Sequence, residues 1–207
     1  MTAIIVIAKA PRAGRSKTRL CPPCTPDQAA ALALAALADT LDAVRATPAA
    51  RHVLVLDGQP GGWLPTGFDV LPQRGRGLDE RLAHAFDDVG GPALLIGMDT
   101  PQVTPRDLRE GLARLAQPTT DAVLGPAPDG GYWAVGLRRP DPRAFLGVPM
   151  STARTGTAQR ARLARLGLRV RDLPALRDVD VIADARAVAT LAPAGRFAHA
   201  LAQIGTA

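Results

Sequence analysis

Short apolar runs alternate along the chain with longer stretches that have the periodicity of helices. Residues 3–8 (Ala-Ile-Ile-Val-Ile-Ala), 51–57 and 92–98 are dominated by β-branched and aliphatic side chains. Such continuous runs are typical of strands that are buried on both faces of a parallel sheet. Because helical stretches separate the runs, the pattern predicts an α/β fold with a mostly parallel sheet and helices on both faces.

The other elements follow from capping residues and from the spacing of apolar residues. Thr25-Pro26 and Thr104-Pro105 each place a threonine N-cap before a proline, which marks the start of a helix. The predicted helices span 25–46, 78–89, 104–116, 156–166, 181–191 and 196–204, and the further strands 68–71, 121–125, 132–137 and 168–173. No repeat or linker divides the chain, so residues 1–207 are expected to form a single domain.

Composition excludes several classes of function. The net charge is +6, but only 3% of residues are aromatic, so no stacking platform for nucleic acid is expected. A run of arginines is interpreted mainly as a solvated face, with attraction of an anionic substrate as the alternative; it comprises Arg154, Arg160, Arg162, Arg165, Arg169 and Arg171. No apolar run reaches the length of a membrane helix and no secretion signal is evident, so we expect a cytoplasmic protein with no membrane partner.

The two cysteines form the motif Cys21-Pro22-Pro23-Cys24. A Cys-x-x-Cys pair can be redox-active or can supply half of a zinc site. The chain has no second pair, and its three histidines are scattered. We therefore expect no metal or redox role for these thiols.

A strongly basic loop follows the first apolar run. Between Ala8 and Leu20 it carries five cations, namely Lys9, Arg12, Arg15, Lys17 and Arg19. Its spacing matches neither a P-loop nor a dinucleotide fingerprint. Gly14 allows the backbone to turn, and Lys17 and Arg19 can neutralise phosphate oxygens. The loop is predicted to bind an anion, with a merely solvated basic loop as the alternative.

Asp99 ends the apolar run at 92–98, within Gly97-Met98-Asp99-Thr100-Pro101. Ligands of open α/β sheets bind beyond the carboxyl ends of the strands, so Asp99 and the basic loop are expected at one edge. A carboxylate in that place suits Mg²⁺, which binds few protein oxygens and keeps its waters or phosphate oxygens. The alternative is that Asp99 caps a nearby helix.

These motifs, taken together, resemble a bacterial family of nucleotide-diphospho-sugar transferase-like proteins. The resemblance also extends to 2-phospholactate guanylyltransferases and, more distantly, to molybdopterin guanylyltransferases. Besides the basic loop and Gly97–Pro101, it rests on Gln73-x-Gly75-x-Gly77-Leu78-x-x-Arg81, Gly125-Pro126-Ala127-Pro128-Asp129-Gly130-Gly131-Tyr132-Trp133, Ser151-Thr152 and Asp178-Val179-Asp180. It covers most of the chain and implies a three-layer αβα sandwich of the nucleotide-diphospho-sugar transferase (Rossmann-like) type.

The resemblance implies a role for each motif. The nucleotide would contact Ala8, Ala10, Pro11, Gly14, Lys17, Arg19, Gln73 and Gly75, the last two at the base or ribose. Charge at the reacting phosphates would be neutralised by Lys9, Arg12, Lys17 and Arg19. The acceptor would contact Asp129, Gly130, Gly131, Tyr132, Ser151 and Thr152. Mg²⁺ (or Mn²⁺) would be held by Asp99, Asp178 and Asp180.

Ordinary structural roles stay open for several of these residues. The Gln73–Gly75 segment can be a simple turn, and Asp180 can be an N-cap. Residues 128–133 can form an Asp-Gly turn with its aromatic side chains in the core.

The favoured function is nucleotidyl transfer from a nucleoside triphosphate to a small anionic acceptor. The dense cations suit a triphosphate, and the edge carries one aspartate where many glycosyltransferases carry an Asp-x-Asp pair. Glycosyl transfer from a nucleotide sugar and a non-catalytic nucleotide-binding domain are the alternatives. The expected partners are a nucleotide and a small-molecule acceptor, with a homodimer left open.

Overall fold

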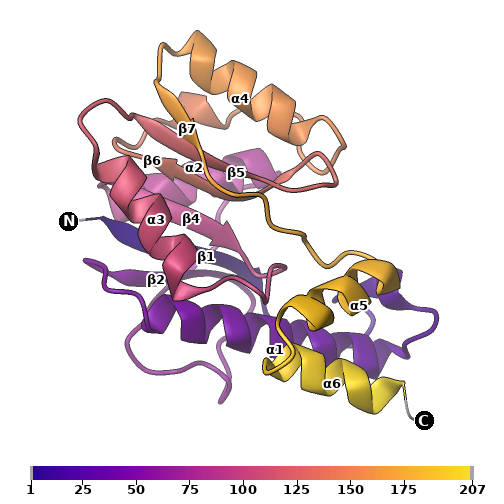
Figure 1. Ribbon diagram of the computed structural model, residues 1–207. Helices are drawn as coiled ribbons and strands as arrows, with labels where there is room; N and C mark the ends of the chain where they lie inside the picture. The colour runs from indigo at the N-terminus through magenta and orange to yellow at the C-terminus, as the bar shows by residue number, and fades with distance from the viewer. Residues whose placement is uncertain (1, 206–207) are drawn as a thin grey trace.

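The fold is built on one sheet of seven strands, in the order β3-β2-β1-β4-β6-β5-β7 (Figure 1). The computed structural model describes residues 2–205; Met1, Thr206 and Ala207 lie outside the described residues. The strands are β1 (Ala3–Lys9), β2 (His52–Asp57), β3 (Asp69–Pro72), β4 (Ala93–Gly97), β5 (Ala122–Pro126), β6 (Tyr132–Leu137) and β7 (Val170–Asp172). All the predicted strands are present, with small shifts at their ends.

The sheet is mostly parallel, as the alternating pattern predicts. Strands β3, β2, β1 and β4 pair in parallel, and so do β5 and β7. Strand β6 is the exception, because it pairs antiparallel with both β4 and β5. The connection from β5 to β6 is a short turn over 127–131, which can only join antiparallel neighbours.

The predicted helices are also present. They are α1 (Pro26–Arg45), α2 (Leu78–Val89), α3 (Pro105–Ala116), α4 (Thr155–Arg165), α5 (Ile182–Leu191) and α6 (Arg196–Ile204), with 3₁₀ turns η1 (Thr18–Leu20) and η2 (Pro142–Ala144). Thr25 and Thr104 cap α1 and α3 in reciprocal capping boxes, each with proline at the first turn. In the described part of the chain, no helix combines the length and the apolar character needed to cross a membrane.

Helices cover both faces of the sheet, which confirms the three-layer architecture (Figure 1). Ile4 and Val6 of β1 pack with side chains of α1 and α3. Ile5, which points to the opposite face, packs with side chains of α2 and α4. On that second face Phe86 and Phe145 stack, with ring centroids 5.1 Å apart.

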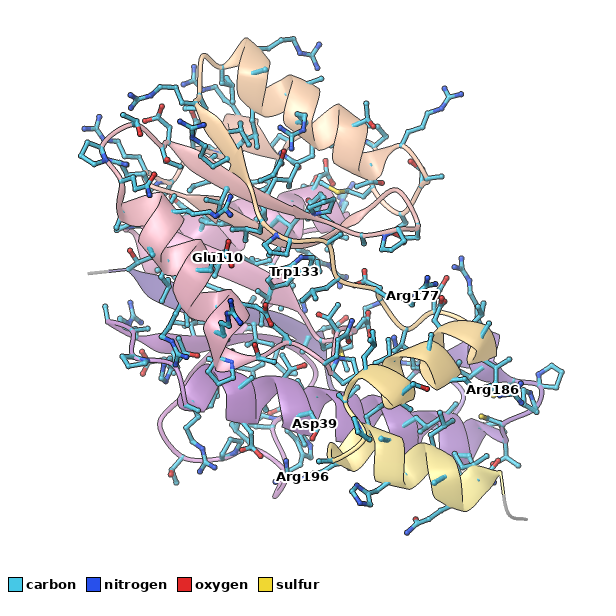
Figure 2. All side chains as sticks on the ribbon, in the orientation of Figure 1. Asp39, Glu110, Trp133, Arg177, Arg186 and Arg196 are labelled. Carbon is cyan, nitrogen blue, oxygen red and sulfur yellow. The ribbon has the colours of Figure 1, made fainter. Side chains whose placement is uncertain are left out.

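A third apolar cluster joins α5 and α6 to α1, beside the sheet rather than over it (Figure 1). Asp39 of α1 accepts hydrogen bonds from the amides of Arg196 and Phe197, at 3.0 and 2.9 Å. These amides are the first of α6 and have no partner within their own helix. Figure 2 shows Asp39 and Arg196 facing each other at this junction. A carboxylate from α1 therefore caps α6, whose own N-cap Gly195 has no side chain to do so.

The ion pair between Asp121 and Arg169 generates a prediction about acid stability. Arg169 donates from Nε and Nη2 to the two oxygens of Asp121, at 2.7 and 3.0 Å, and these side-chain bonds lower the pKa of Asp121 to about 2. Because the folded pKa lies below the unfolded value of about 3.9, the stabilisation is complete above about pH 4 and is lost as the pH falls through 2. Arg169 is more than half exposed, so we reduce the expected contribution to about 1 kcal/mol.

In urea unfolding, Asp121→Asn should lower the free energy of unfolding by about that amount at pH 7. The difference in free energy of unfolding between Asp121→Asn and the parent should become smaller as the pH falls from 5 to 2. The matched control is Asp87→Asn, at an exposed carboxylate with no ion pair in the described part of the chain. A difference that stayed constant over this pH range would contradict the assignment.

Candidate functional site

The carboxyl ends of β1 and β4 lie side by side and position the candidate site. The two strands pair in parallel, with Ile7 opposite Gly97, so the basic loop and Asp99 leave the same edge of the sheet. Val179 donates its amide to the carbonyl of Asp99 at 2.8 Å, which brings the segment before α5 to this edge. The structure therefore brings together the basic loop, Asp99 and the motif Asp178-Val179-Asp180.

Lys17 and Asp99 form an ion pair at the centre of this edge. Lys17 Nζ lies 2.5 Å from Asp99 Oδ1 and also donates to the carbonyl of Val179. The Lys17 side chain is only 9% exposed, whereas that of Asp99 is 47% exposed. A predicted phosphate ligand is thus paired with a predicted metal ligand.

Asp178 lies beside this ion pair in an excess of negative charge. No residue in the described part of the chain donates a hydrogen bond to its carboxylate. Burial, together with the nearby charges of Asp99, Asp129 and Asp180, raises its pKa to about 7 against the opposing effect of Lys17. A small cavity of ≈ 150 Å³ adjoins these groups, lined by Pro128, Asp129, Arg177, Asp178, Asp180 and Asp184.

The alternative capping roles of Asp99 and Asp180 are wrong. The N-cap of α3 is Thr104, and the N-cap of α5 is Val181. Asp184 accepts hydrogen bonds from the amides of Asp180 and Val181 at 3.3 and 3.1 Å, so it satisfies the start of α5 in place of a polar N-cap.

The two remaining carboxylates at this edge form ion pairs next to α5. Asp180 pairs with Arg19, and Asp184 pairs with Arg177 at 2.9 Å. Within residues 2–205 no group of three or more His, Cys, Asp or Glu side chains is arranged as a metal-binding cluster.

The other cations of the basic loop face solvent. Lys9, Arg12 and Arg15 are exposed and form no ion pair with any described residue. Gly14 turns the backbone at φ 72°, and Arg12 donates its amide to Ser16 Oγ at 2.9 Å. Three side chains of this loop therefore remain available to a polyanion.

The Gln73 loop is held by internal hydrogen bonds. Gln73 Nε2 donates to the carbonyls of Ala8 and Val55 at 2.7 and 3.2 Å, and its Oε1 accepts from Arg81 at 3.0 Å. Gly75 has φ 113°, and a Cβ there would lie 2.6 Å from Cβ of Glu80. Both residues thus have structural roles that tie β2 and the start of α2 to the end of β1; their contact with a base stays a prediction.

The turn at 127–131 packs tightly on the start of α4. Gly130 has φ 88°, and its carbonyl accepts from the amide of Gly156 at 2.8 Å. Asp129 Oδ1 accepts from the amide of Gly131 at 2.9 Å, which closes the turn. The turn is therefore fixed next to the carboxylates, because Asp129 both stabilises it and lines the same cavity as Asp178.

Tyr132 and Trp133, which follow the turn, belong to the core. Tyr132 donates its hydroxyl to Gln159 at 3.2 Å, and burial raises its pKa above the usual value. Trp133 donates to the carbonyl of Pro174 at 2.9 Å, and Figure 2 shows it beneath the segment that leads from β7 to α5. Thr152 accepts from the amide of Arg154 at the start of α4, while Ser151 is exposed with φ 57°. The Tyr132 hydroxyl is thus engaged with Gln159 of α4, and the contacts of Tyr132, Ser151 and Thr152 with an acceptor stay predictions.

Residues that the motifs did not single out also shape the site. Asp184 is one example, because its capping role has no signal in the sequence beyond its position near Asp180. The backbone carbonyl of Val179, inside the motif Asp178-Val179-Asp180, is a contact that no side-chain pattern encodes. Cys24 is buried in the third apolar cluster, and burial raises the pKa of its thiol, with Cys21 adding to the effect.

The fold and the arrangement at its edge define the class of nucleotide-diphospho-sugar transferase-type α/β proteins, and comparisons with known proteins agree. A crystal structure from Desulfovibrio desulfuricans G20, assigned to the nucleotide-diphospho-sugar transferases, superimposes with a TM-score of 0.78 at 29% identity over 89% of this chain and 85% of that chain. The cytidylyltransferase for 2-C-methyl-D-erythritol 4-phosphate from Thermus thermophilus shares the fold, with a TM-score of 0.59 at 16% identity over 93% of this chain and 100% of that chain.

The sequence comparisons give the family. Residues 28–152 match the family described as "Uncharacterized protein conserved in bacteria (DUF2064)", and the chain belongs to it. It is also 33% identical over 196 residues to phosphoenolpyruvate guanylyltransferase from Salinispora arenicola (strain CNS-205). The aligned residues cover 90% of this chain and 87% of that relative. The protein is thus an enzyme of the nucleotidyltransferase or sugar-transferase type.

The close packing of Gly130 generates a prediction. A Cβ at this position would lie 2.0 Å from the carbonyl oxygen of Ala153, in addition to the strain of φ 88°. Gly130→Ala should therefore lower the free energy of unfolding by more than about 2 kcal/mol. The matched control is Gly167→Ala, where φ is 73° but no atom lies within 4 Å of the new Cβ. Its cost should stay near 1 kcal/mol, and equal losses in urea unfolding would show that packing on Ala153 is unimportant.

Proposed function

We propose that this enzyme transfers a nucleotidyl group from a nucleoside triphosphate to a small anionic acceptor, with a divalent cation held at Asp99 and Asp178. The observation that carries the proposal is the meeting of the basic loop with these carboxylates at one edge of the sheet. Cations for a polyphosphate and carboxylates for a metal are thereby available to one substrate.

The carboxylates fit a hard divalent cation. Asp178 receives no hydrogen bond in the described structure and lies among Asp99, Asp129 and Asp180, so its charged form is unfavourable there. Mg²⁺ and Mn²⁺ bind such oxygen ligands and complete their shells with water or phosphate oxygens. Asp99 and Asp178 are the proposed ligands. We assign Asp180 an outer position, because it pairs with Arg19.

In the proposed reaction, an oxygen of the acceptor's phosphate or carboxylate attacks the α-phosphorus of the nucleotide. The bond from the α-phosphorus to the oxygen that bridges to the β-phosphorus breaks, and pyrophosphate leaves with the electron pair. The exposed Lys9 and Arg12 and the paired Lys17 and Arg19 neutralise the phosphate charge that develops. When bound, Mg²⁺ supplies further neutralisation of the triphosphate.

Nucleotidyl transfer is favoured over glycosyl transfer by two features. The loop offers three cations without ion pairs to described residues, which suits a triphosphate, and the chain's guanylyltransferase relative and the shared cytidylyltransferase fold support the same chemistry. The relative's name makes a guanine nucleotide and phosphoenolpyruvate the first pair to test. Glycosyl transfer remains the second candidate because of the Desulfovibrio neighbour.

A direct assay separates the two reactions. The protein is incubated with Mg²⁺ and each nucleoside triphosphate in turn, together with small phosphorylated or carboxylated acids. Nucleotidyl transfer should release pyrophosphate and form a nucleotide conjugate that mass spectrometry detects. Release of a nucleoside diphosphate from nucleotide sugars, without pyrophosphate release from any triphosphate, would favour glycosyl transfer instead.

The carboxylate site generates a binding prediction. Asp178→Asn should weaken Mg²⁺-dependent binding of the nucleoside triphosphate at least tenfold, about 1.4 kcal/mol, and chelation of the metal should weaken the parent similarly. Without metal, the variant should be as stable as the parent or slightly more so, because a repelled, partly buried charge is removed. Calorimetry measures the affinity and urea unfolding the stability.

The matched control is Asp87→Asn, at an exposed carboxylate near the C-terminal end of α2. It should bind the nucleoside triphosphate with Mg²⁺ as tightly as the parent does. Full Mg²⁺-dependent affinity in Asp178→Asn would contradict the role of Asp178.

A further inference from the structure

The carboxylate edge already holds a cation, and that cation is the ammonium of Lys17. Its Nζ lies between the Asp99 carboxylate, at 2.5 Å from Oδ1, and the carbonyl of Val179. Its side chain is almost entirely buried, which is unusual for a lysine unless it is paired. The ammonium is therefore bound at the edge and does not project freely into solvent.

The oxygens around Lys17 Nζ are of the kind that a divalent cation binds. Carboxylate and backbone carbonyl oxygens are the ligands that Mg²⁺ and Mn²⁺ prefer. We propose that Lys17 and the divalent cation are alternative partners of Asp99: Lys17 occupies Asp99 in the nucleotide-free protein and passes to the phosphates when nucleotide and cation bind. This inference rests on the proposed function, since it assigns that site its order of assembly.

The change requires only a side-chain movement. The carbonyl of Lys17 accepts from the amide of Leu20 at 2.9 Å, and Leu20 and Val179 are buried in the same apolar cluster. The backbone on both sides of the contact is thus anchored. The lysine side chain has four rotatable bonds, and Asp99 is half exposed, so the ammonium can leave without moving the loop.

The charge at this edge explains why the exchange is favourable only with nucleotide. A single ammonium faces Asp99, with Asp178 and Asp129 close by, so the site keeps a net negative charge. A cation that arrives alone must displace Lys17 and leave a buried ammonium without its partner, which costs free energy. A triphosphate offers that ammonium new oxygens, so Lys17 weakens the binding of the free cation and couples it to nucleotide binding.

The first test measures the binding of Mn²⁺ alone to the nucleotide-free protein, by calorimetry and by electron paramagnetic resonance. Lys17→Met removes the ammonium and keeps the length of the side chain, so it should bind Mn²⁺ at least tenfold more tightly than the parent. Arg15→Met is the matched control for the loss of one charge from the same loop, because Arg15 is exposed and forms no ion pair with a described residue. It should change the affinity less than twofold.

Adding Asp99→Asn to Lys17→Met should remove the gain. Equal Mn²⁺ affinity in the parent and in Lys17→Met would overturn the proposal, and so would an equal gain in Arg15→Met.

The second test uses the parent protein and does not depend on the folding of a variant. The chain contains only two lysines, so amine labelling followed by mass spectrometry reports on Lys17 with Lys9 as the internal reference. Lys9 is exposed, and Lys17 is buried in its ion pair, so Lys17 should react at least tenfold more slowly without metal. Saturating Mn²⁺ should accelerate Lys17 several-fold and Lys9 little. Unchanged labelling of Lys17 would overturn the proposal.

A third measurement separates this proposal from the proposed function. If the parent binds no nucleoside triphosphate with Mg²⁺, the proposed function fails, whatever the result with Mn²⁺ alone. If the parent binds nucleotide but Lys17→Met gains no affinity for Mn²⁺, only the exchange at Asp99 fails.

Discussion

The parallel pairing of β1 with β4 is the constraint on which the rest of the site depends. Strand β1 is hydrogen-bonded on both edges, by β2 and β4, and its side chains are buried on both faces. It therefore cannot shift its register without moving apolar residues of two cores at once. This rigidity fixes the points at which the backbone leaves the sheet, at Lys9 and at Gly97. The basic loop therefore starts from a fixed position beside Asp99.

The C-terminal helices take part in the site through the segment that precedes them. Val179 is buried between η1, α1 and α5, and its two backbone groups bond to Asp99 and to Lys17. Asp39 of α1 holds the start of α6 in addition. The helices therefore brace the edge of the sheet: they hold Asp178 and Asp180 opposite the basic loop, although more than 150 residues separate these aspartates from Lys17 along the chain.

The sequence predicted the elements well, because burial on both faces of a strand and capping at a helix start are local signals. The apolar run at 3–8 and the Thr-Pro starts of α1 and α3 are examples. The position of β6 between β4 and β5 was not predicted, since strand order depends on tertiary packing that a single apolar run does not encode. The side-chain partners were also beyond prediction: Lys17 was expected to meet phosphate and is paired with Asp99, and Asp184 performs the capping that Asp180 was a candidate for.

Glycine and aromatic motifs illustrate why a motif does not by itself reveal a ligand contact. Gly75 and Gly130 are needed where the backbone adopts positive φ and approaches the starts of α2 and α4. Tyr132 is needed where its hydroxyl can reach Gln159 in the core. These structural roles place the loops that carry Gln73 and Asp129 and require no substrate contact, so the motif by itself does not establish one.

The cations at this edge are of two kinds: those held in ion pairs and those exposed to solvent without one among the described residues. Lys17 is paired with Asp99 and almost entirely buried, so under the proposed exchange it leaves that partner to bind a ligand. Arg19, although paired with Asp180, is 72% exposed and has further N–H donors on its guanidinium. The exposed cations of the basic loop need no such exchange and can attract a polyanion from a distance. In the proposed binding step, an anionic substrate meets the exposed cations first, and Lys17 changes partner afterwards. Under the proposed exchange, the partly buried pair of Lys17 and Asp99 adds selectivity. Separating the pair costs free energy, and only a ligand that supplies new contacts to both residues offsets that cost.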